Sequence, residues 1–257
     1  MNDYFTALTN TLLYLPSDVI QRVTCVLHEA RLNKRMIFVM GNGGSASTAS
    51  HFAADLSKNT YNPEYPSFRA ISLADNMAIF SAYANDEGYE NVFARQVASL
   101  ADPGDIVIAI SASGNSMNVV RAVEVANQIG ATTIGFTGFT GGKVGNLVDI
   151  HLHVPSTIIE QVEDIHLLLE HMICKNLREN IAEFDALVHS TANNGNEELV
   201  SKPGFHIEQE SAAFQLLNNL TQATDKDHGF QSMLYQCLQL SLEGTGADSG
   251  SLIAADD

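Results

Sequence analysis

Short apolar runs alternate with helix-like segments through the first 180 residues, and this alternation limits the fold more than any other feature. The apolar runs have the length of buried strands, and the segments between them carry apolar residues at helical spacing. Strands are predicted over 36–40, 69–73, 105–111, 132–136 and 150–154. Helices are predicted over 4–13, 17–32, 45–56, 77–84, 92–100, 118–128 and 159–181. Strands that alternate with helices predict an α/β fold, here a doubly wound parallel five-stranded sheet with helices on both faces.

The composition of the chain changes after about Phe184, where the alternation of strand-like and helix-like segments stops. Residues 185–209 have the polar, Asn- and Glu-rich composition of a linker. Residues 210–257 show helical patterns and end in "GADSGSLIAADD", and together with "LLNNLTQATD" they resemble the start of a GAF domain. A complete GAF domain needs about 100 further residues. We therefore expect a fragment of a longer protein or a remnant, with an unrelated acidic helical tail as the alternative.

The chain has a formal net charge of −17, which is unevenly spread. Residues 1–180 hold 11 Lys and Arg against 18 Asp and Glu, and residues 181–257 hold 2 against 12. Such a surface repels phosphate backbones, so direct nucleic-acid binding is not expected. No apolar run is long enough for a membrane span, and the residues after Met1 lack the basic start and apolar stretch of a secretory signal, so we expect neither feature. Three widely spaced cysteines predict reduced thiols in a cytoplasm: Cys25, Cys174 and Cys237.

Two polar loops each follow a predicted strand and open a predicted helix. The first loop, residues 41–47, reads GNGGSAS, and the second loop, residues 111–116, reads SASGNS. Glycines allow close backbone approach to a ligand, and a helix N-terminus presents unpaired N–H donors to an anion. Serine hydroxyls add donors, although one serine at such a position can simply cap the helix. Two such loops in one sheet favour a bound phosphate.

The first loop also fits the dinucleotide pattern G-x-G-x-x-G/A through Gly41, Gly43 and Ala46. That interpretation needs an acidic residue about 20 positions further on. The nearest candidate, Asp75, comes too late in the chain.

His51 and Asp55 lie four residues apart on the helix that follows the first loop, so their side chains share one face. An imidazole and a carboxylate at this spacing suit a proton-transfer pair or half of a zinc site. An ordinary surface His–Asp pair has the same spacing.

Five segments, taken together, resemble the phosphoheptose isomerases of the sugar-isomerase (SIS) family: "GNGGSASTASHFAADL", "ANDEGYENVFARQV", "SASGNSMNVVRAVEVA", "TGGKVGNLVDIHLHVP" and "VEDIHLLLEHMICKNL". The motifs occur in family order and place an SIS domain over residues 1–184. The resemblance implies that sugar phosphate contacts Ser45, Ser111, Ser113 and Ser116. It implies further substrate contacts at Asn42, Gly43, Gly44, Asp86, Asn115 and Glu163.

The same resemblance implies that Asp55 and His171 transfer protons. It also implies a zinc ion held by His51, Asp55, Glu163 and His171. The family usually has Glu at position 55 and Gln at position 163, and this chain lacks the family's Gly-Arg pair at 58–59. Eight helical residues separate Glu163 from His171 by about 12 Å. We therefore expect His171 to reach a neighbouring copy, in a homotetramer whose active sites are shared between subunits.

The expected function is the aldose–ketose isomerisation of sedoheptulose 7-phosphate to D-glycero-D-manno-heptose 7-phosphate. One alternative is a non-catalytic SIS module, either a phosphosugar sensor or an adaptor for a replication initiator. Another is a different phosphosugar isomerase, acting on arabinose 5-phosphate or a hexulose phosphate. Four further residues are expected mainly to pack or to face the sheet end: His151, His153, His166 and Cys174.

Overall fold

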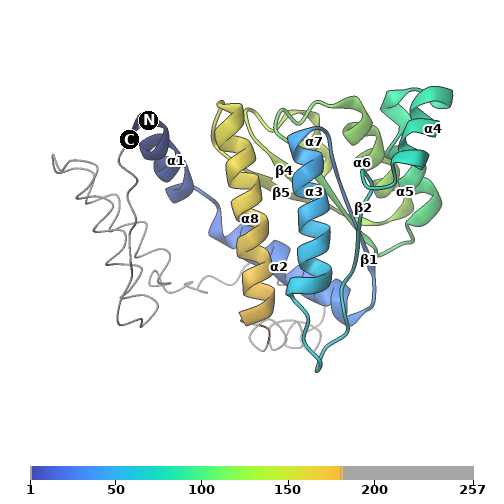
Figure 1. The fold of residues 1–257 in the computed structure, drawn as a ribbon, viewed down its shortest axis with the longest axis horizontal. Coiled ribbons are helices and arrows are strands. Elements are labelled where there is room, and N and C mark those ends of the chain that lie inside the picture. Colours follow the sequence, from blue (N-terminus) through green and yellow to red (C-terminus); the bar gives the residue numbers. More distant parts are fainter. Residues whose placement is uncertain (1, 180, 182–257) are drawn as a thin grey trace, which may run out of the picture. The chain divides into compact units, whose positions relative to one another are not determined.

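The structure is a computed structural model that describes residues 2–179 and 181 (Figure 1). The linker and GAF-like expectations, over 185–257, lie outside these residues. Helix α1 (Asn2–Leu13) is described by itself, and the described residues from Tyr14 on belong to a separate compact unit. In the described part of the chain, no helix is long and apolar enough to cross a membrane.

The compact unit is built on a parallel sheet of five strands, which confirms the predicted fold class. Its strands are β1 (Met36–Gly41), β2 (Arg69–Ser72), β3 (Ile106–Ser111), β4 (Thr132–Thr137) and β5 (Ile150–His153). Their order across the sheet is β2-β1-β3-β4-β5, and every neighbouring pair is parallel. Each strand lies within about two residues of its predicted range, the usual uncertainty of strand ends.

Helices cover both faces of this sheet. The unit's helical elements are α2 (Ser17–Leu32), α3 (Gly44–Ala54), the π-helix η1 (Asp55–Asn59), α4 (Met77–Glu87), the 3₁₀-helix η2 (Tyr89–Asn91), α5 (Ala94–Leu100), α6 (Met117–Ile129), α7 (Gly142–Leu147) and α8 (Ile159–Glu179). Helices α2, α3 and α8 pack together on one face, and α5, α6 and α7 pack on the other. Figure 1 shows α3 and α8 side by side.

The strands read as continuous apolar runs because both of their faces are buried. Phe38 and Met40 lie in the core cluster beneath α5 and α6. Ile37 and Val39 are equally buried and, because side chains alternate along a strand, they point to the opposite face.

Helix α8 finds its burial within its own chain. Its sequence carries apolar residues around most of the helix circumference, a pattern that predicts cover by a second copy. The structure instead buries one stripe against α2 and α3, including Val162, Ile165, Leu169, Ile173 and Leu177. Leu167 and Leu168 are half-buried and Met172 is exposed, so the outer face of α8 carries the remaining apolar surface.

Strand order places both polar loops at one point of the sheet. The first loop follows β1 and the second loop follows β3, and these two strands are neighbours. The helix after β1 lies on one face, and the helix after β3 lies on the other. Ligands of doubly wound sheets bind where the winding direction changes in this way.

Candidate active site

The first loop turns tightly at its glycines to start α3. A Cβ added at Gly41 would lie 2.6 Å from the carbonyl oxygen of Ser45, so the close approach requires glycine. Gly43, the N-cap of α3, has φ +54 and makes no side-chain cap. Ser45 is buried in the first turn of the helix. These features leave the start of α3 open to an anion.

The second loop has the same construction at the start of α6. Gly114 has φ +64, and a Cβ there would lie 2.0 Å from the carbonyl oxygen of Gly141. Ser116 is the N-cap of α6, yet its side chain makes no capping hydrogen bond. Ser113 is exposed, and its hydroxyl accepts a hydrogen bond from the backbone N–H of Asn115 at 3.2 Å. The alternative that these serines merely cap the helix therefore does not account for Ser116.

A pair of asparagines joins the first loop to the first turn of α6, which directly follows the second loop. The Asn42 side-chain amide donates to Oδ1 of Asn118 at 2.9 Å, and the Asn118 amide donates to Oδ1 of Asn42 at 2.8 Å. The Tyr89 hydroxyl also donates to Oδ1 of Asn42, at 2.9 Å. Asn118 is 2% exposed, so this bond is shielded from water. Asn42 was expected to line the pocket, and its amide is engaged in holding the loops together.

Replacing Asn118 by leucine is expected to destabilise the fold by about 1–3 kcal/mol, because the amide of Asn42 loses its buried partner. The loops should then lose their alignment, and the KM for a phosphosugar should rise. Urea unfolding and steady-state kinetics measure the two effects. Tyr89→Phe removes one exposed contact and should change both quantities less. Equal effects of the two substitutions would contradict the role given to the asparagine pair.

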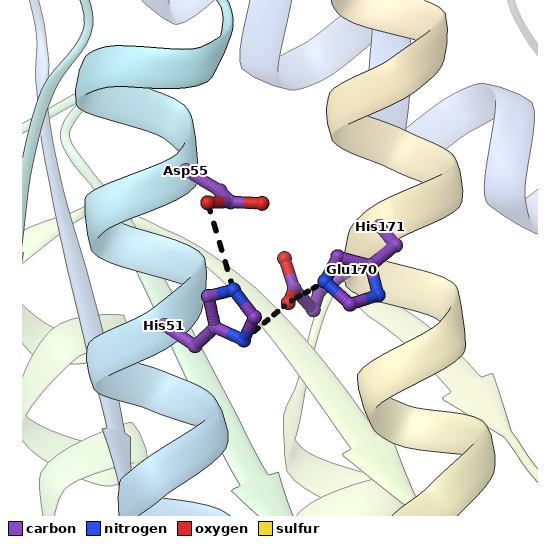
Figure 2. A group of neighbouring side chains, drawn as sticks. All are labelled: His51, Asp55, Glu170 and His171. Atoms are coloured by element: carbon purple, nitrogen blue, oxygen red, sulfur yellow. Dashed lines mark ion pairs between the residues drawn. The ribbon is translucent and has the colours of Figure 1, made fainter.

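Four side chains that can hold a metal meet between α3 and α8 (Figure 2). His51 comes from α3 and Asp55 from the start of η1, while Glu170 and His171 come from α8. One ligand atom from each lies within 4.8 Å of the other three. The imidazole rings of His51 and His171 have centroids 4.9 Å apart, and both side chains are about half exposed, at 45% and 50%. This four-residue cluster is therefore open to solvent through its histidines.

Glu170 is the buried member of the four-residue cluster. Its side chain is 0% exposed, and Oε1 lies 3.3 Å from Nδ1 of His51 and 3.3 Å from Nε2 of His171. Neither carboxylate oxygen makes a well-aligned hydrogen bond. Burial, reinforced by the charge of Asp55, raises the pKa of Glu170 to about 8. A buried carboxylate without donors needs a proton or a cation beside it, so the four residues fit a divalent metal.

Glu163, which was expected to be a metal ligand, lies apart from this cluster. Glu170 takes the place that was expected for Glu163. A Cβ added at Gly44 would lie 2.8 Å from Oε1 of Glu163, so that carboxylate lies at the start of α3, beside the first loop. The seven residues from Glu163 to Glu170 are about two helical turns, or roughly 10 Å. Within one chain, Glu163 and His171 therefore do not meet at a single ion.

His171 lies beside His51 of its own chain. The expectation that it reaches a neighbouring copy rested on pairing it with Glu163. The carboxylate beside His171 is that of Glu170, and these two residues form the four-residue cluster with His51 and Asp55 of the same chain.

The other expected residues lie outside the four-residue cluster. Asp86 is exposed on α4 and accepts a hydrogen bond from the side chain of Asn85 at 2.7 Å. His151 Nε2 lies 2.7 Å from the Thr137 hydroxyl. His153 Nε2 lies 3.1 Å from the carbonyl oxygen of Phe139. Both histidines thus bind neighbouring strand ends, in agreement with a packing role.

His166 is buried on the inner face of α8. Its ring lies 6.0 Å from that of Phe136, and neither nitrogen makes a well-aligned hydrogen bond. Burial lowers the pKa of His166 to about 4, although the nearby backbone of Thr137 opposes part of the shift.

His166 is expected to make the protein acid-sensitive. Its pKa is lower in the folded state than the unfolded value of about 6.5, so the unfolded state binds the proton first as the pH falls. Between pH 7 and pH 5 this linkage costs about 2 kcal/mol of folding free energy. His166→Leu should remove that loss, as measured by urea unfolding at both pH values. An unchanged pH dependence in the variant would contradict the assignment.

Sequence reasoning missed Glu170 and Lys143. Glu170 occupies a position on the buried stripe of α8, one residue after Leu169 and three before Ile173, and an acidic residue there was the available signal. Lys143 opens α7, and its Nζ lies 3.8 Å from the sulfur of Met117, the first residue of α6. Lys143 brings a positive charge close to the second loop. The sequence patterns did not indicate this role.

Comparisons with known proteins agree with this architecture. A family model described as the SIS domain matches residues 2–138. The phosphoheptose isomerase of Aliarcobacter butzleri is 43% identical over 158 residues, 62% of this chain and 83% of that protein. The phosphoheptose isomerase of Helicobacter pylori is 41% identical over 165 residues, 64% of this chain and 85% of that protein. A solved phosphoheptose isomerase from Francisella tularensis has a TM-score of 0.65 at 32% identity, over 69% of this chain and 96% of that one.

Proposed function

Because this chain belongs to the SIS-domain family of phosphoheptose isomerases, we propose that it converts sedoheptulose 7-phosphate to D-glycero-D-manno-heptose 7-phosphate. The observation that carries the proposal is the meeting of His51, Asp55, Glu170 and His171 on helices that begin or pass beside the first loop. Phosphate-binding loops and a proton-transfer centre are the two parts that such an isomerase needs.

The phosphate is held at the starts of α3 and α6. Ser45, Ser111, Ser113 and Ser116 offer hydroxyls there, and the helix starts add N–H donors. Gly43, Gly44 and Asn115 complete the two turns, and Lys143 supplies a nearby positive charge. Because the chain as a whole is acidic, these local donors must provide the attraction for the phosphate.

The reacting end of the sugar reaches the four-residue cluster. From Gly44 to His51 the axis of α3 rises about 10 Å, a span that an open heptose chain can bridge. Asp55 takes the proton from C1 of the ketose and returns it to C2, which forms the aldose. His171 transfers the proton between the oxygens on C1 and C2. Glu163 lies at the start of α3, where its carboxylate can accept a hydrogen bond from a sugar hydroxyl.

A divalent cation, which we take to be zinc, fits the cluster. His51, Asp55, Glu170 and His171 would hold it, and Glu170 would gain the charge partner that it otherwise lacks. Nitrogen and carboxylate ligands in this combination suit zinc. When bound, the ion supplies Lewis-acid polarisation of the substrate oxygens.

Assembly and location follow as parts of the same proposal. Exposed apolar residues on the outer surface support a homotetramer, among them Met77, Ile79, Ile159 and Met172. In such an assembly the half-exposed histidines of the cluster would lie next to a neighbouring subunit. We place the enzyme in the cytoplasm, where widely spaced cysteines stay reduced.

The non-catalytic alternative is not favoured. A sensor or adaptor has no need for two histidines and two carboxylates that meet within 4.8 Å. Relatives at 41% and 43% identity, and the Francisella tularensis structure, are named as phosphoheptose isomerases.

Incubation with sedoheptulose 7-phosphate and zinc, followed by NMR, tests the proposed function. We expect the aldose product to form, with exchange of solvent deuterium at C1 or C2. Phosphosugar binding without turnover, in the presence of zinc, would instead support the sensor function. Arabinose 5-phosphate and a hexulose phosphate serve as competing substrates.

A further inference from the structure

The Asp55 carboxylate has a dedicated hydrogen-bond donor. The side-chain amide of Asn59 donates to Oδ1 of Asp55 at 2.6 Å. We propose that Asn59 is the positioning residue of the reaction: it fixes the orientation of the Asp55 carboxylate within the four-residue cluster. This inference rests on the proposed function, because it gives Asp55 its task.

The other members of the four-residue cluster do not hold the Asp55 carboxylate by a hydrogen bond. Nε2 of His51 lies 3.6 Å from the same oxygen of Asp55, beyond hydrogen-bond length. Glu170, a second carboxylate, faces the two histidines and makes no hydrogen bond to the Asp55 carboxylate. The Asn59 amide is therefore the donor that orients Asp55.

The π-helix η1 sets the geometry of this pair. It begins at Asp55 and ends at Asn59, directly after the last α-helical residue, Ala54. Single π-turns interrupt α-helices frequently at functional sites. Here the turn carries both the reacting carboxylate and its donor.

The end of η1 is itself held in place by buried groups. The Thr60 hydroxyl donates to the carbonyl oxygen of Leu56 at 2.6 Å. The guanidinium of Arg31 donates to the carbonyl oxygen of Thr60 at 3.3 Å and lies 4.9 Å from the ring centroid of Phe68. Arg31 is 1% exposed, so this support is shielded from solvent. Asn59 therefore projects from a rigid turn, which is what a positioning residue requires.

Asn59→Leu in the full chain tests the inference. Loss of an outer hydrogen bond to a metal ligand typically costs 10- to 100-fold in metal affinity or activity, and we expect that loss in zinc affinity and in kcat. The KM should stay close to the wild-type value, because both phosphate loops are intact. Asn59→Gln keeps a donor and should recover part of the loss. Ser57→Ala, an exposed change on the same π-turn, should alter neither quantity.

A paired exchange separates positioning from folding. Asp55→Asn combined with Asn59→Asp keeps a hydrogen bond between the two positions and should keep the wild-type Tm, yet it should lose zinc affinity and turnover. Zinc affinity is measured by competition with a chromophoric chelator. Unchanged zinc affinity and kcat in Asn59→Leu, or losses that merely follow a lowered Tm, would overturn the inference. A wild-type protein that neither binds zinc nor turns over the sugar would overturn the proposed function and this role with it.

Discussion

Replacing His171 by glutamine is expected to lower kcat for sedoheptulose 7-phosphate by about 10²- to 10⁴-fold, the usual contribution of a general acid–base group. Glutamine has a similar reach and can form hydrogen bonds, but it cannot take up or release a proton near neutral pH. The imidazole of His171 lies against His51 and within 3.3 Å of Glu170, so its loss removes both a proton carrier and a metal ligand.

The KM should change little in this variant, because the first loop lies about two helical turns of α3 from His51, the residue that His171 contacts. Lys175→Gln is the matched control, since Lys175 is exposed one turn further along α8 and pairs with Glu179 there. That control should retain the wild-type kcat. A His171→Gln enzyme with normal kcat and a raised KM would show that the residue binds substrate without taking part in the chemistry.

Replacing Gly114 by alanine is expected to destabilise the protein by about 3 kcal/mol or more and to raise the KM strongly. The residue has φ +64, which costs an alanine about 1–2 kcal/mol. Its Cβ would also lie 2.0 Å from the carbonyl oxygen of Gly141, so one of the two backbone segments must move. That movement shifts Ser113 and the start of α6, where the phosphate is proposed to bind.

Gly43→Ala provides the comparison at the first loop. Gly43 also has positive φ, at +54, but nothing lies within 4 Å of an added Cβ. Its ψ of −123 lies outside the left-handed helical region, so the expected loss is about 1–3 kcal/mol, from backbone conformation alone. Urea unfolding and KM measurements on both variants separate the cost of the backbone conformation from the cost of the steric clash with Gly141. Similar losses in the two variants would contradict the close packing of the second loop against Gly141.

The fold could be predicted largely from local patterns. Apolar runs such as 105–111 become buried strands because helices cover both sheet faces, and the two loops follow from glycine and serine at strand ends. His51 and Asp55 could be paired from their four-residue spacing, which any helix brings to one face. These features depend only on residues close together in the sequence.

The remaining features depend on contacts between distant segments. Spacing along α8 does not reveal that Glu170 meets His51 of α3, because that contact depends on the rotation of one packed helix against another. The partner of Asn42 is Asn118, 76 residues away, and no local signal joins them. The π-turn at Asp55 was also missed, since residues 45–56 read as one continuous helix.

The most direct test of the central claim is a crystal structure with zinc and sedoheptulose 7-phosphate, with diffraction recorded on both sides of the zinc absorption edge. We expect an anomalous peak about 2.0–2.2 Å from nitrogen and oxygen atoms of His51, Asp55, Glu170 and His171. The phosphate should lie against Ser113 and Ser116, with C1 and C2 of the sugar beside Asp55. Zinc bound elsewhere, or a phosphate outside both loops, would contradict the account.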